Sequence, residues 1–255
     1  MNSNNKELSQ PKLYNLELIN FKFKIMKQKL IIIGASTTAI HVYKFINEYE
    51  LFDIVGFAVN RQYINEEIFM GLPLYSIEDL EDIIDKNEDL LFVAMLWNKL
   101  NADRRHIYEN LKKEGYHFAN IISPTAKIRG KLKGDNCWIH DYAIIQNDVE
   151  IGENVAMMAF TLIGAHTEIG SHCFFGAKST IGGGCKIGKQ SFIGINSTVF
   201  DDTIIGEKCI VGACTAVKRN MPDYSLCKTS STNTEIKQYS EDIIESKLLF
   251  SKNVR

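Results

Sequence analysis

The amino-acid sequence predicts an α/β domain followed by an all-β parallel β-helix, with a short helix near the C-terminal end. Three observations predict this fold class. Strand and helix patterns alternate over the first half, an aliphatic residue recurs at every sixth position of the second half, and apolar residues recur at helical spacing close to the end. We therefore expect a flexible extension (residues 1–25), the α/β domain (26–120), the β-helix (121–222) and a C-terminal segment (223–255).

Composition and charge narrow the range of partners. Hydrophobic residues make up 45% of the 255 residues and the formal net charge is −2, with lysine and glutamate mixed along the sequence. This charge creates no basic field of the kind that holds nucleic acid or an anionic membrane, so neither partner is expected. No uninterrupted apolar run of signal-peptide length opens the chain, and a cytoplasmic protein with reduced cysteines is predicted.

The first 25 residues are polar at first and then alternate apolar residues with lysine. The run "MKQKLIIIG", which begins at Met26, resembles a natural N-terminus. Residues 1–25 are therefore either a flexible extension or a product of start-site choice, and neither interpretation gives them any chemistry.

The α/β domain is predicted element by element. A buried strand over Leu30–Ile33, a glycine turn, an amphipathic helix from residue 37 to about residue 49 and a second buried strand over Ile54–Val59 form a βαβ beginning. A short helix opened by Ser76, a strand within "LLFVAML" and a helix ended by Gly115 follow. This alternation predicts a small parallel sheet, with any ligand at the carboxyl ends of its strands.

The turn after the first strand is a candidate phosphate site. It contains Gly34, Ala35, Ser36 and Thr37, whose N–H groups and hydroxyls would meet a ligand at a helix N-terminus, where the partial positive charge favours phosphate. The second and third glycines of a dinucleotide fingerprint are missing. A tight turn without a ligand is therefore the alternative interpretation.

Two other segments reach the same edge of the predicted sheet and add Asn60, Arg61 and Trp97 to the candidate substrate-binding residues. Asn60 and Arg61 follow the second strand in place of the acidic residue that would hold an NAD ribose, so a dinucleotide cofactor is not expected. Trp97 follows another strand together with Asn98 and Asn101, and this aromatic face and these amides suit a sugar or a base. Packing of Trp97 against the second domain is the alternative.

The second half repeats with a six-residue period. An aliphatic or aromatic residue stands at every sixth position from residue 139 to residue 217, and a small residue precedes each of them by two places. A parallel β-helix has this period, because each hexad forms one side of a triangular coil and stacked coils share one core. Both columns are therefore predicted to point inward. Four cysteines fall in the small-residue column and need be neither ligands nor disulfides: Cys137, Cys173, Cys185 and Cys209. Glycine often follows the aliphatic position, as expected where the chain turns sharply and needs a permissive backbone.

Five stretches carry a resemblance to a known family: "LIIIGAS", "LKKEGYHFANIISPTA", "IGSHCFFGAK", "STIGGGCKIGKQSFIGINSTV" and "IVGACTAVKRNMPDYS". Over about residues 27–225 the chain resembles the sialic acid O-acetyltransferase-like hexapeptide-repeat acyltransferases, which include bacterial nucleotide-amino-sugar N-acetyltransferases. The resemblance implies a left-handed β-helix, a Rossmann-like N-terminal domain that holds the nucleotide of a sugar, and a homotrimer with acetyl-CoA between neighbouring solenoids. It thus implies acetylation of an amino or hydroxyl group of a nucleotide-linked sugar.

The resemblance also implies site residues. It maps the general base onto His166 in "IGAHTE" and the backbone amide that binds the oxyanion onto Gly183 in "STIGGGCK". Ile195 and Ala213, assigned to the same corner column as Gly183, are the expected further CoA contacts. Lys218 and Arg219 in the last coil suit the CoA phosphates, and no metal is implied.

The sequence departs from the family pattern at several positions. The family base more often sits one place earlier, where this chain has Ala165, and an acidic residue often follows the base, where this chain has Thr167 and then Glu168. The acid that reads uracil after the second strand is replaced by Val59 and Asn60, and the closing small-residue motif by "LCKTSSTN". His172, at the equivalent outward corner of the next hexad, is accordingly a second candidate base.

Other functions remain open from the sequence alone. Zinc held between subunits by His140, His166 and His172 is disfavoured, because their spacing differs from that of hexapeptide carbonic anhydrases. A solenoid trimer that binds a sugar nucleotide or acts as a scaffold, without turnover, is the alternative to an enzyme. The tail has Ile236, Tyr239, Ile243, Ile244 and Leu248 at helical spacing, which predicts either a docked amphipathic helix or a frayed terminus.

Overall fold

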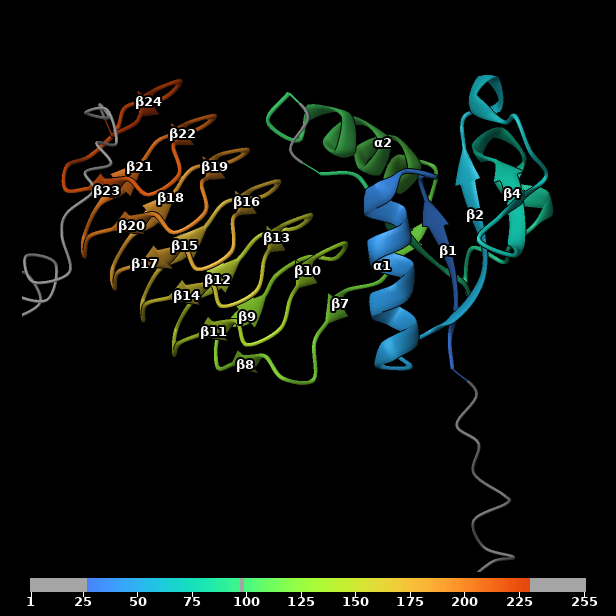
Figure 1. Cartoon of the computed structure of the whole chain (residues 1–255), viewed down its shortest axis with the longest axis horizontal. Coiled ribbons are helices and arrows are strands. Elements are labelled where there is room, and N and C mark those ends of the chain that lie inside the picture. The colour runs from blue at the N-terminus through green and yellow to red at the C-terminus, as the bar shows by residue number, and fades with distance from the viewer. Residues whose placement is uncertain (1–26, 97–98, 230–255) are drawn as a thin grey trace, which may run out of the picture.

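The computed structural model describes residues 27–96 and 99–229, which form an α/β domain followed by a left-handed parallel β-helix (Figure 1). The predicted fold class is confirmed over these residues. The extension over residues 1–25, Trp97 and the predicted C-terminal helix lie outside them. Within the described part of the chain, no helix has both the length and the apolar character needed to cross a membrane.

The α/β domain is built on a six-stranded sheet of order β3-β4-β2-β1-β5-β6, in which only the β3–β4 pair is antiparallel. Its elements are β1 (Lys29–Ile33), α1 (Thr37–Glu48), β2 (Asp53–Val59), the 3-10 helix η2 (Arg61–Tyr63), β3 (Ile68–Phe69), β4 (Leu72–Ser76), the 3-10 helix η3 (Ile77–Asp82), β5 (Leu90–Val93), α2 (Ala102–Lys113) and β6 (His117–Phe118). The β3–β4 hairpin escaped prediction because β3 has two residues and β4 contains Pro73, which weakens a strand pattern.

Alternate residues of β1 hold the two helices on opposite faces of the sheet. Leu30 and Ile32 lie in one core cluster with the apolar face of α1, whereas Ile31 and Ile33 lie in another cluster with α2. All four side chains are buried, as a central strand with a two-residue side-chain period requires. The carboxyl end of β1 is therefore enclosed between α1 and α2.

The β-helix consists of two-residue strands, and from β10 (Trp138–Ile139) to β20 (Thr198–Val199) each pairs with the strand 18 residues further along the chain, as Trp138 pairs with Ala156 and Ala156 with Phe174. Three parallel sheets form the sides of the prism, with orders β24-β22-β19-β16-β13-β10-β7, β23-β20-β17-β14-β11-β8 and β21-β18-β15-β12-β9. The strands are β7 (Ile121–Ile122), β8 (Lys127–Ile128), β9 (Lys131–Leu132), β10 (Trp138–Ile139), β11 (Ile144–Ile145), β12 (Glu150–Ile151), β13 (Ala156–Met157), β14 (Leu162–Ile163), β15 (Glu168–Ile169), β16 (Phe174–Phe175), β17 (Thr180–Ile181), β18 (Lys186–Ile187), β19 (Phe192–Ile193), β20 (Thr198–Val199), β21 (Ile204–Ile205), β22 (Ile210–Val211), β23 (Ala216–Val217) and β24 (Leu226–Cys227).

Both predicted inward columns are buried. The aliphatic column forms a continuous core along the prism, and the small column lies beside it at the turns. The cysteines of the small column are free thiols whose Sγ atoms contact turn carbonyls, as Cys173 contacts the carbonyl of Gly188 at 3.2 Å. The prediction that these cysteines are buried corner residues is confirmed.

The expected reason for the solenoid glycines is wrong. The left-handed backbone at each corner is adopted two residues after the glycine, by residues such as Asn154 (φ 57°), His166 (φ 58°) and His172 (φ 64°). The glycine itself is required by crowding between coils: a Cβ on Gly176 would stand 2.5 Å from the backbone nitrogen of Ile195 in the next coil. Close stacking of coils, and not a permissive φ, therefore selects glycine at this position.

We expect Gly176→Ala to destabilise the fold by about 1–3 kcal/mol, because the added methyl group must displace backbone of the next coil. Gly212→Ala is the matched control, since Gly212 occupies the same column in the last coils and its Cβ would meet nothing closer than Lys228 Cβ at 3.3 Å. Urea unfolding of both variants checks the difference. Equal losses of stability in the two would contradict the crowding argument.

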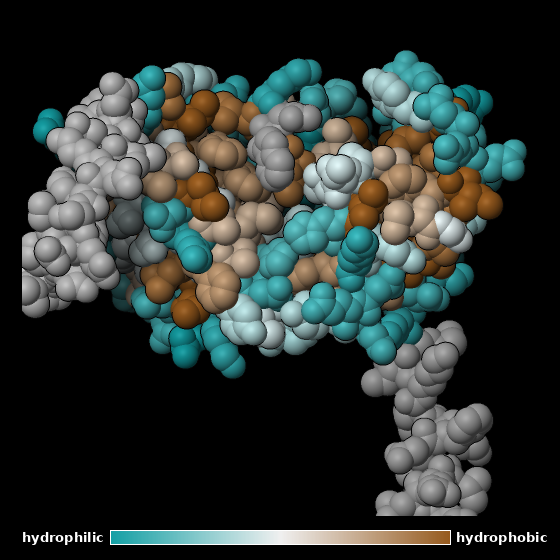
Figure 2. All heavy atoms as spheres, viewed as in Figure 1, coloured by the Kyte–Doolittle hydropathy of each residue, from teal (hydrophilic) through white to brown (hydrophobic). Residues whose placement is uncertain are grey.

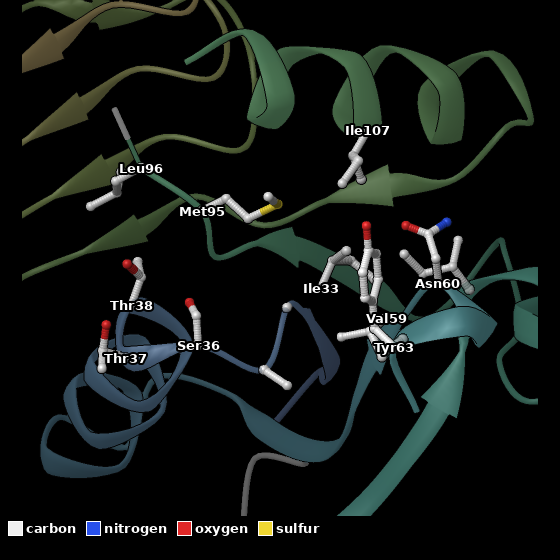
Figure 3. A pocket seen from close by; sticks show the side chains of 14 residues that line it. Ile33, Ser36, Thr37, Thr38, Val59, Asn60, Tyr63, Met95, Leu96 and Ile107 are labelled. Carbon is white, nitrogen blue, oxygen red and sulfur yellow. The ribbon is translucent and has the colours of Figure 1, made fainter. Parts of the chain in front are cut away.

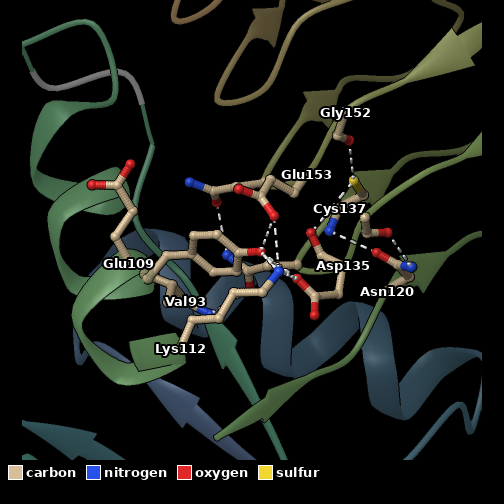
Figure 4. A network of polar contacts seen from close by, with 12 residues as sticks. Val93, Glu109, Lys112, Asn120, Asp135, Cys137, Gly152 and Glu153 are labelled. Atoms are coloured by element: carbon tan, nitrogen blue, oxygen red, sulfur yellow. Dashed lines mark hydrogen bonds and ion pairs between the residues drawn. The ribbon is translucent and has the colours of Figure 1, made fainter. Parts of the chain in front are cut away.

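The two domains share one apolar cluster and a network of polar contacts. Phe45 of α1 packs in a T-shaped contact on Trp138 of the prism, with ring centroids 5.9 Å apart. Beside α2, the Lys112 ammonium lies 3.0 Å from an Asp135 oxygen and 2.8 Å from a Glu153 oxygen, as Figure 4 shows. These contacts fix the α/β domain on the first coils of the solenoid.

The centre of this interface is Arg104 of α2, which is 1% exposed. Its guanidinium donates to the carbonyls of Val93, Met95 and Asn136 at 2.5, 3.1 and 2.6 Å and to Asn154 Oδ1 at 2.5 Å. Burial lowers the pKa of Arg104 to about 10, so the group stays charged at neutral pH. One side chain thus ties the end of β5 to two coils of the prism.

Candidate active site

A cavity of about 500 Å³ opens at the carboxyl ends of β1 and β2, as the parallel sheet predicts. Its lining includes Gly34, Ala35, Ser36, Thr37 and Asn60 from the predicted substrate-binding set. Figure 3 shows the hydroxyl-bearing side chains at the start of α1 on one side of this cavity, with Asn60 and Tyr63 on the other. The structure therefore brings both predicted segments to one site.

The turn after β1 has the geometry of a phosphate cradle. Gly34 has φ 126° and donates its N–H to the carbonyl of Ala58 at 2.8 Å, and a Cβ there would lie 3.2 Å from the carbonyl oxygen of Ala94. Glycine is thus required by both conformation and space. Ser36 is the N-cap of α1 but its side chain makes no capping hydrogen bond, so its hydroxyl remains at the open end of the helix.

Arg61 is not part of the cavity lining. Its guanidinium forms an exposed ion pair with Asp79 at 2.5 Å, and its backbone N–H donates to Glu78 at 3.0 Å. The hydrogen bond from Ser76 to Glu78 is the main reason that the pKa of Glu78 falls to about 2. The 3-10 helix η3 therefore places the permanent carboxylate of Glu78 next to Asn60, whose Nδ2 donates to it at 3.4 Å.

Further residues that the sequence patterns did not assign to the cavity also line it, among them Tyr63, Ile77, Met95 and Ile107. They come from four separate elements or loops, and only the folded sheet brings them together. Their apolar surfaces form a wall opposite the turn at Gly34, which suits the flat face of a base or sugar. Trp97, which was expected at this edge, lies outside the described residues.

The second predicted site lies on the prism at a corner formed by consecutive coils. The His166 side chain is 73% exposed, as predicted for an outward corner, and its Nδ1 lies 3.6 Å from Asp148 Oδ2. Asp148 belongs to the preceding coil and has the same left-handed backbone, with φ 58° in both residues. The sequence motif placed no acid beside this imidazole, because the acid is 18 positions away along the chain.

Gly183 and Gly184 lie next to His166 in the following coil. The N–H of Gly184 donates to the carbonyl of Ala165 at 2.8 Å. Gly184 has φ 66°, and among the described residues it is the one glycine at a left-handed corner of the prism. The coil after His166 therefore has no side chain at this corner, and the space that a Cβ on Gly184 would fill is taken by Oδ1 of Asp202 from the coil beyond.

The amide expected to bind an oxyanion already has a partner. The N–H of Gly183 donates to Asp201 Oδ1 at 2.7 Å. A carboxylate that holds this N–H competes with any substrate oxygen for it. The Asp201 side chain must rotate away before Gly183 can take the role that the sequence assigned to it.

The assignment of Ile195 and Ala213 to the corner of Gly183 is wrong. The coils are 18 residues long, so Gly183 stacks on Ala165 and Asp201, whereas Ile195 stacks with Ala213 at another corner. Two hexads separate Gly183 from Ile195, and each hexad passes one corner of the prism. Both Ile195 and Ala213 are nevertheless exposed, with Ile195 at 54%.

Lys218 and Arg219 lie exposed in the last coil. The Lys218 ammonium is 5.4 Å from the centre of the Phe200 ring, which holds it near the corner that follows β20. Lys218 and Arg219 therefore belong to a coil three steps along the stack from that of His166, beyond the coil of Asp201.

The prediction that His172 lies on an exposed corner is wrong. His172 does adopt the left-handed corner backbone, but helix α2 covers it and leaves it 6% exposed. Its Nδ1 lies 3.0 Å from Asn154 Nδ2, its Nε2 lies 3.5 Å from Glu109, and burial lowers its pKa to about 4. A buried neutral imidazole of this kind is a structural residue of the domain interface.

The three histidines considered for zinc do not converge. His140 Nε2 faces His41 Nε2 at 3.4 Å at the start of the prism, His172 lies under α2, and His166 is exposed at a different corner. Across residues 27–96 and 99–229, no group of three or more histidine, cysteine, aspartate or glutamate side chains could hold a metal ion.

Family models match the prism. Residues 134–164 match the model described as bacterial transferase hexapeptide (six repeats), and residues 166–184 and 184–219 match the hexapeptide repeat of succinyl-transferase. The predicted six-residue repeat is therefore confirmed. A comparison with curated proteins gave no match.

Solved structures match the α/β domain and the prism together. A histidine-to-asparagine variant of perosamine N-acetyltransferase from Caulobacter crescentus, in complex with CoA and GDP-perosamine, is 22% identical with a TM-score of 0.70, and the match covers 83% of this chain and 97% of that one. The acetyltransferase domain of PglB from Neisseria gonorrhoeae FA1090 is 20% identical with a TM-score of 0.70, covering 79% and 96%. WeeI from Acinetobacter baumannii AYE is 17% identical with a TM-score of 0.67, covering 77% and 94%. At these identities the likeness establishes a shared fold, in agreement with the resemblance of the sequence motifs.

Proposed function

We propose that this chain is an acetyl-CoA-dependent acetyltransferase that acetylates an amino or hydroxyl group of a nucleotide-linked sugar. One observation carries the proposal. The two-part fold, matched over 97% of its length, is that of a protein crystallised with CoA and GDP-perosamine, and a second protein of this fold was crystallised with acetyl coenzyme A. The chain supplies a suitable cavity in its α/β domain and an exposed histidine on its prism.

The cavity at the carboxyl end of the sheet is assigned to the nucleotide. Its phosphates would lie at the N-terminus of α1, where Ser36 and Thr37 offer hydroxyls and backbone N–H groups. The base or ribose would lie against Tyr63 and Met95 on the opposite wall. Asn60, which lines the same cavity, offers its side-chain amide to a polar group of the nucleotide.

His166 is assigned as the general base. The acceptor nitrogen or oxygen attacks the thioester carbonyl carbon, and the imidazole takes the proton that the acceptor loses. Collapse of the tetrahedral intermediate breaks the carbon–sulfur bond, and the CoA thiolate leaves and takes up a proton. The Gly183 N–H would stabilise the oxyanion once Asp201 has rotated away from it.

The same proposal includes a homotrimer in the cytoplasm, with acetyl-CoA between neighbouring prisms. Figure 2 shows apolar residues on the surface of the β-helix. On the prism, Tyr142 is 54% exposed and Phe160 is 52% exposed, and their rings stack with centroids 5.0 Å apart. An exposed aromatic stack of this kind suits a contact between subunits. In the groove beside such a contact, Ile195 and Ala213 would touch CoA, and Lys218 and Arg219 would meet its phosphates.

A non-catalytic role is the second candidate, and one contact favours it. The bond from Gly183 to Asp201 occupies the N–H that acyl transfer requires. A chain that keeps this bond would bind a sugar nucleotide or assemble with partners through its prism without turnover. Acetyl-CoA binding therefore separates the two candidates.

Calorimetric titration with acetyl-CoA tests the proposal without any choice of acceptor. We expect saturable binding at one site per subunit, followed by release of free CoA thiol when nucleotide-linked amino sugars are added. No binding at millimolar acetyl-CoA would favour the non-catalytic scaffold. Binding without thiol release for any acceptor would assign the prism to CoA recognition alone.

A further inference from the structure

We propose that Asp148 is the positioning residue for the His166 imidazole, acting from the preceding coil of the prism. The proposal rests on the proposed function of His166 as the base. In this pair, the acid and the imidazole come from two successive coils and are not neighbours in the sequence. The motif around His166 contains Thr167 where such an acid would stand.

The geometry of the corner supports this pairing. The two residues are separated by one full coil and share a φ of 58°, so their side chains leave the backbone in the same direction. The backbone N–H of His166 donates to the carbonyl of Asn147 at 3.1 Å, which sets the stacking distance between the two turns. Asp148 Oδ2 then lies 3.6 Å from His166 Nδ1.

The role of Asp148 depends on which ring nitrogen of His166 it faces, and that nitrogen is Nδ1. At 3.6 Å the contact is an electrostatic one, and pairs of this kind shorten to hydrogen bonds in reactive complexes. A carboxylate facing Nδ1 favours the tautomer that carries its proton on Nδ1 and leaves a lone pair on Nε2. Nε2 is then the atom that accepts the proton from the acceptor, and Asp148 stabilises the imidazolium that forms.

Glu168 is the carboxylate closest to His166 in sequence, and its surroundings are different. Its side chain leaves from strand β15 on an adjoining side of the prism. Its Oε1 forms an exposed ion pair with Lys186 at 3.3 Å. Glu168→Gln is therefore a matched control. It removes the same charge close to His166 in the sequence, but from a side chain that pairs with Lys186.

The experiment compares Asp148→Asn and Glu168→Gln in the full chain. Asparagine occurs at three other left-handed corners of the prism, Asn136, Asn154 and Asn196, so the Asp148 substitution preserves the turn. The first readout is the ¹⁵N chemical shift of the His166 ring nitrogens at pH 8, which reports the tautomer without any substrate. The second readout is kcat and KM for thiol release from acetyl-CoA.

We expect the Nδ1–H tautomer to dominate in the parent protein and in Glu168→Gln, and to lose its excess in Asp148→Asn. We also expect Asp148→Asn to lower kcat by roughly tenfold or more with little change in KM, because it removes orientation and charge from the base. An unchanged tautomer ratio in Asp148→Asn, or an equal loss of kcat in Glu168→Gln, would overturn the proposal. If no acceptor supports turnover, the proposed function fails while the tautomer measurement still decides the role of Asp148.

Discussion

His166→Ala is expected to lower kcat for acetyl transfer by about 10²–10⁴-fold, the range over which a general base contributes. The binding of acetyl-CoA should be unchanged, because the His166 side chain is 73% exposed and supports no packing. Thiol release at saturating acceptor measures the rate, and calorimetric titration measures the affinity. A loss of kcat without a loss of acetyl-CoA affinity would identify His166 as a base and not as a binding residue.

Lys178→Ala is the control for this prediction. Lys178 is exposed and has the same left-handed backbone at another corner, with φ 60°. Its truncation therefore makes a comparable change in the turn without altering the corner of His166, and activity should remain at the level of the parent protein. Full turnover by His166→Ala would instead show that the acceptor needs no protein base at this corner. His172 could not replace it without movement of α2.

Arg104→Met is expected to produce the largest loss of stability, about 3 kcal/mol or more. The change preserves much of the side-chain volume but leaves the buried carbonyls of Val93 and Asn136 without their charged donor. Asn154 Oδ1 loses one of its two donors and keeps the Asn136 side-chain amide. Each buried acceptor left unpaired costs about 1–3 kcal/mol. Thermal unfolding should shift down by roughly 6–12 °C, on the scale of about 2–4 °C per kcal/mol for a protein of this size.

Arg105→Met separates this effect from the general loss of a positive charge on α2. The Arg105 side chain is 36% exposed, and its guanidinium donates to Gln190 Oε1 at 2.7 Å. We expect a loss of about 1 kcal/mol for this neighbour. Similar shifts in melting temperature for the two variants would mean that Arg104 is not the centre of the domain interface.

The β-helix was predictable because its repeat can be recognised along the sequence itself, without knowledge of contacts between distant segments. A six-residue repeat states which residues point inward, and burial of Ile145, Ile163 and Ile181 follows from their spacing alone. The turn at Gly34 was equally accessible, since a strand, a glycine and a helix are consecutive in the sequence. Both features depend on short-range order along the chain.

The features that escaped prediction depend on contacts between distant segments. His166 and His172 occupy equivalent positions in successive hexads, but α2 covers only the second, and nothing in the hexads distinguishes them. The pairing of Gly183 with Asp201 and of His166 with Asp148 crosses from one coil to the next. The error over Ile195 had the same origin, because adjacent hexads turn through different corners.

In a prism of 18-residue coils, two residues that are 18 positions apart in the sequence lie next to each other at the same corner. A side chain moved by one coil length keeps its corner, its backbone conformation and its outward direction, and changes only its height. Reactive groups can therefore migrate between coils during evolution, with a neighbour in sequence replaced by a neighbour in the stack. A sequence alignment of such proteins will therefore miss an interacting side chain that has moved to a neighbouring coil. A comparison of the residues that share a corner would find it.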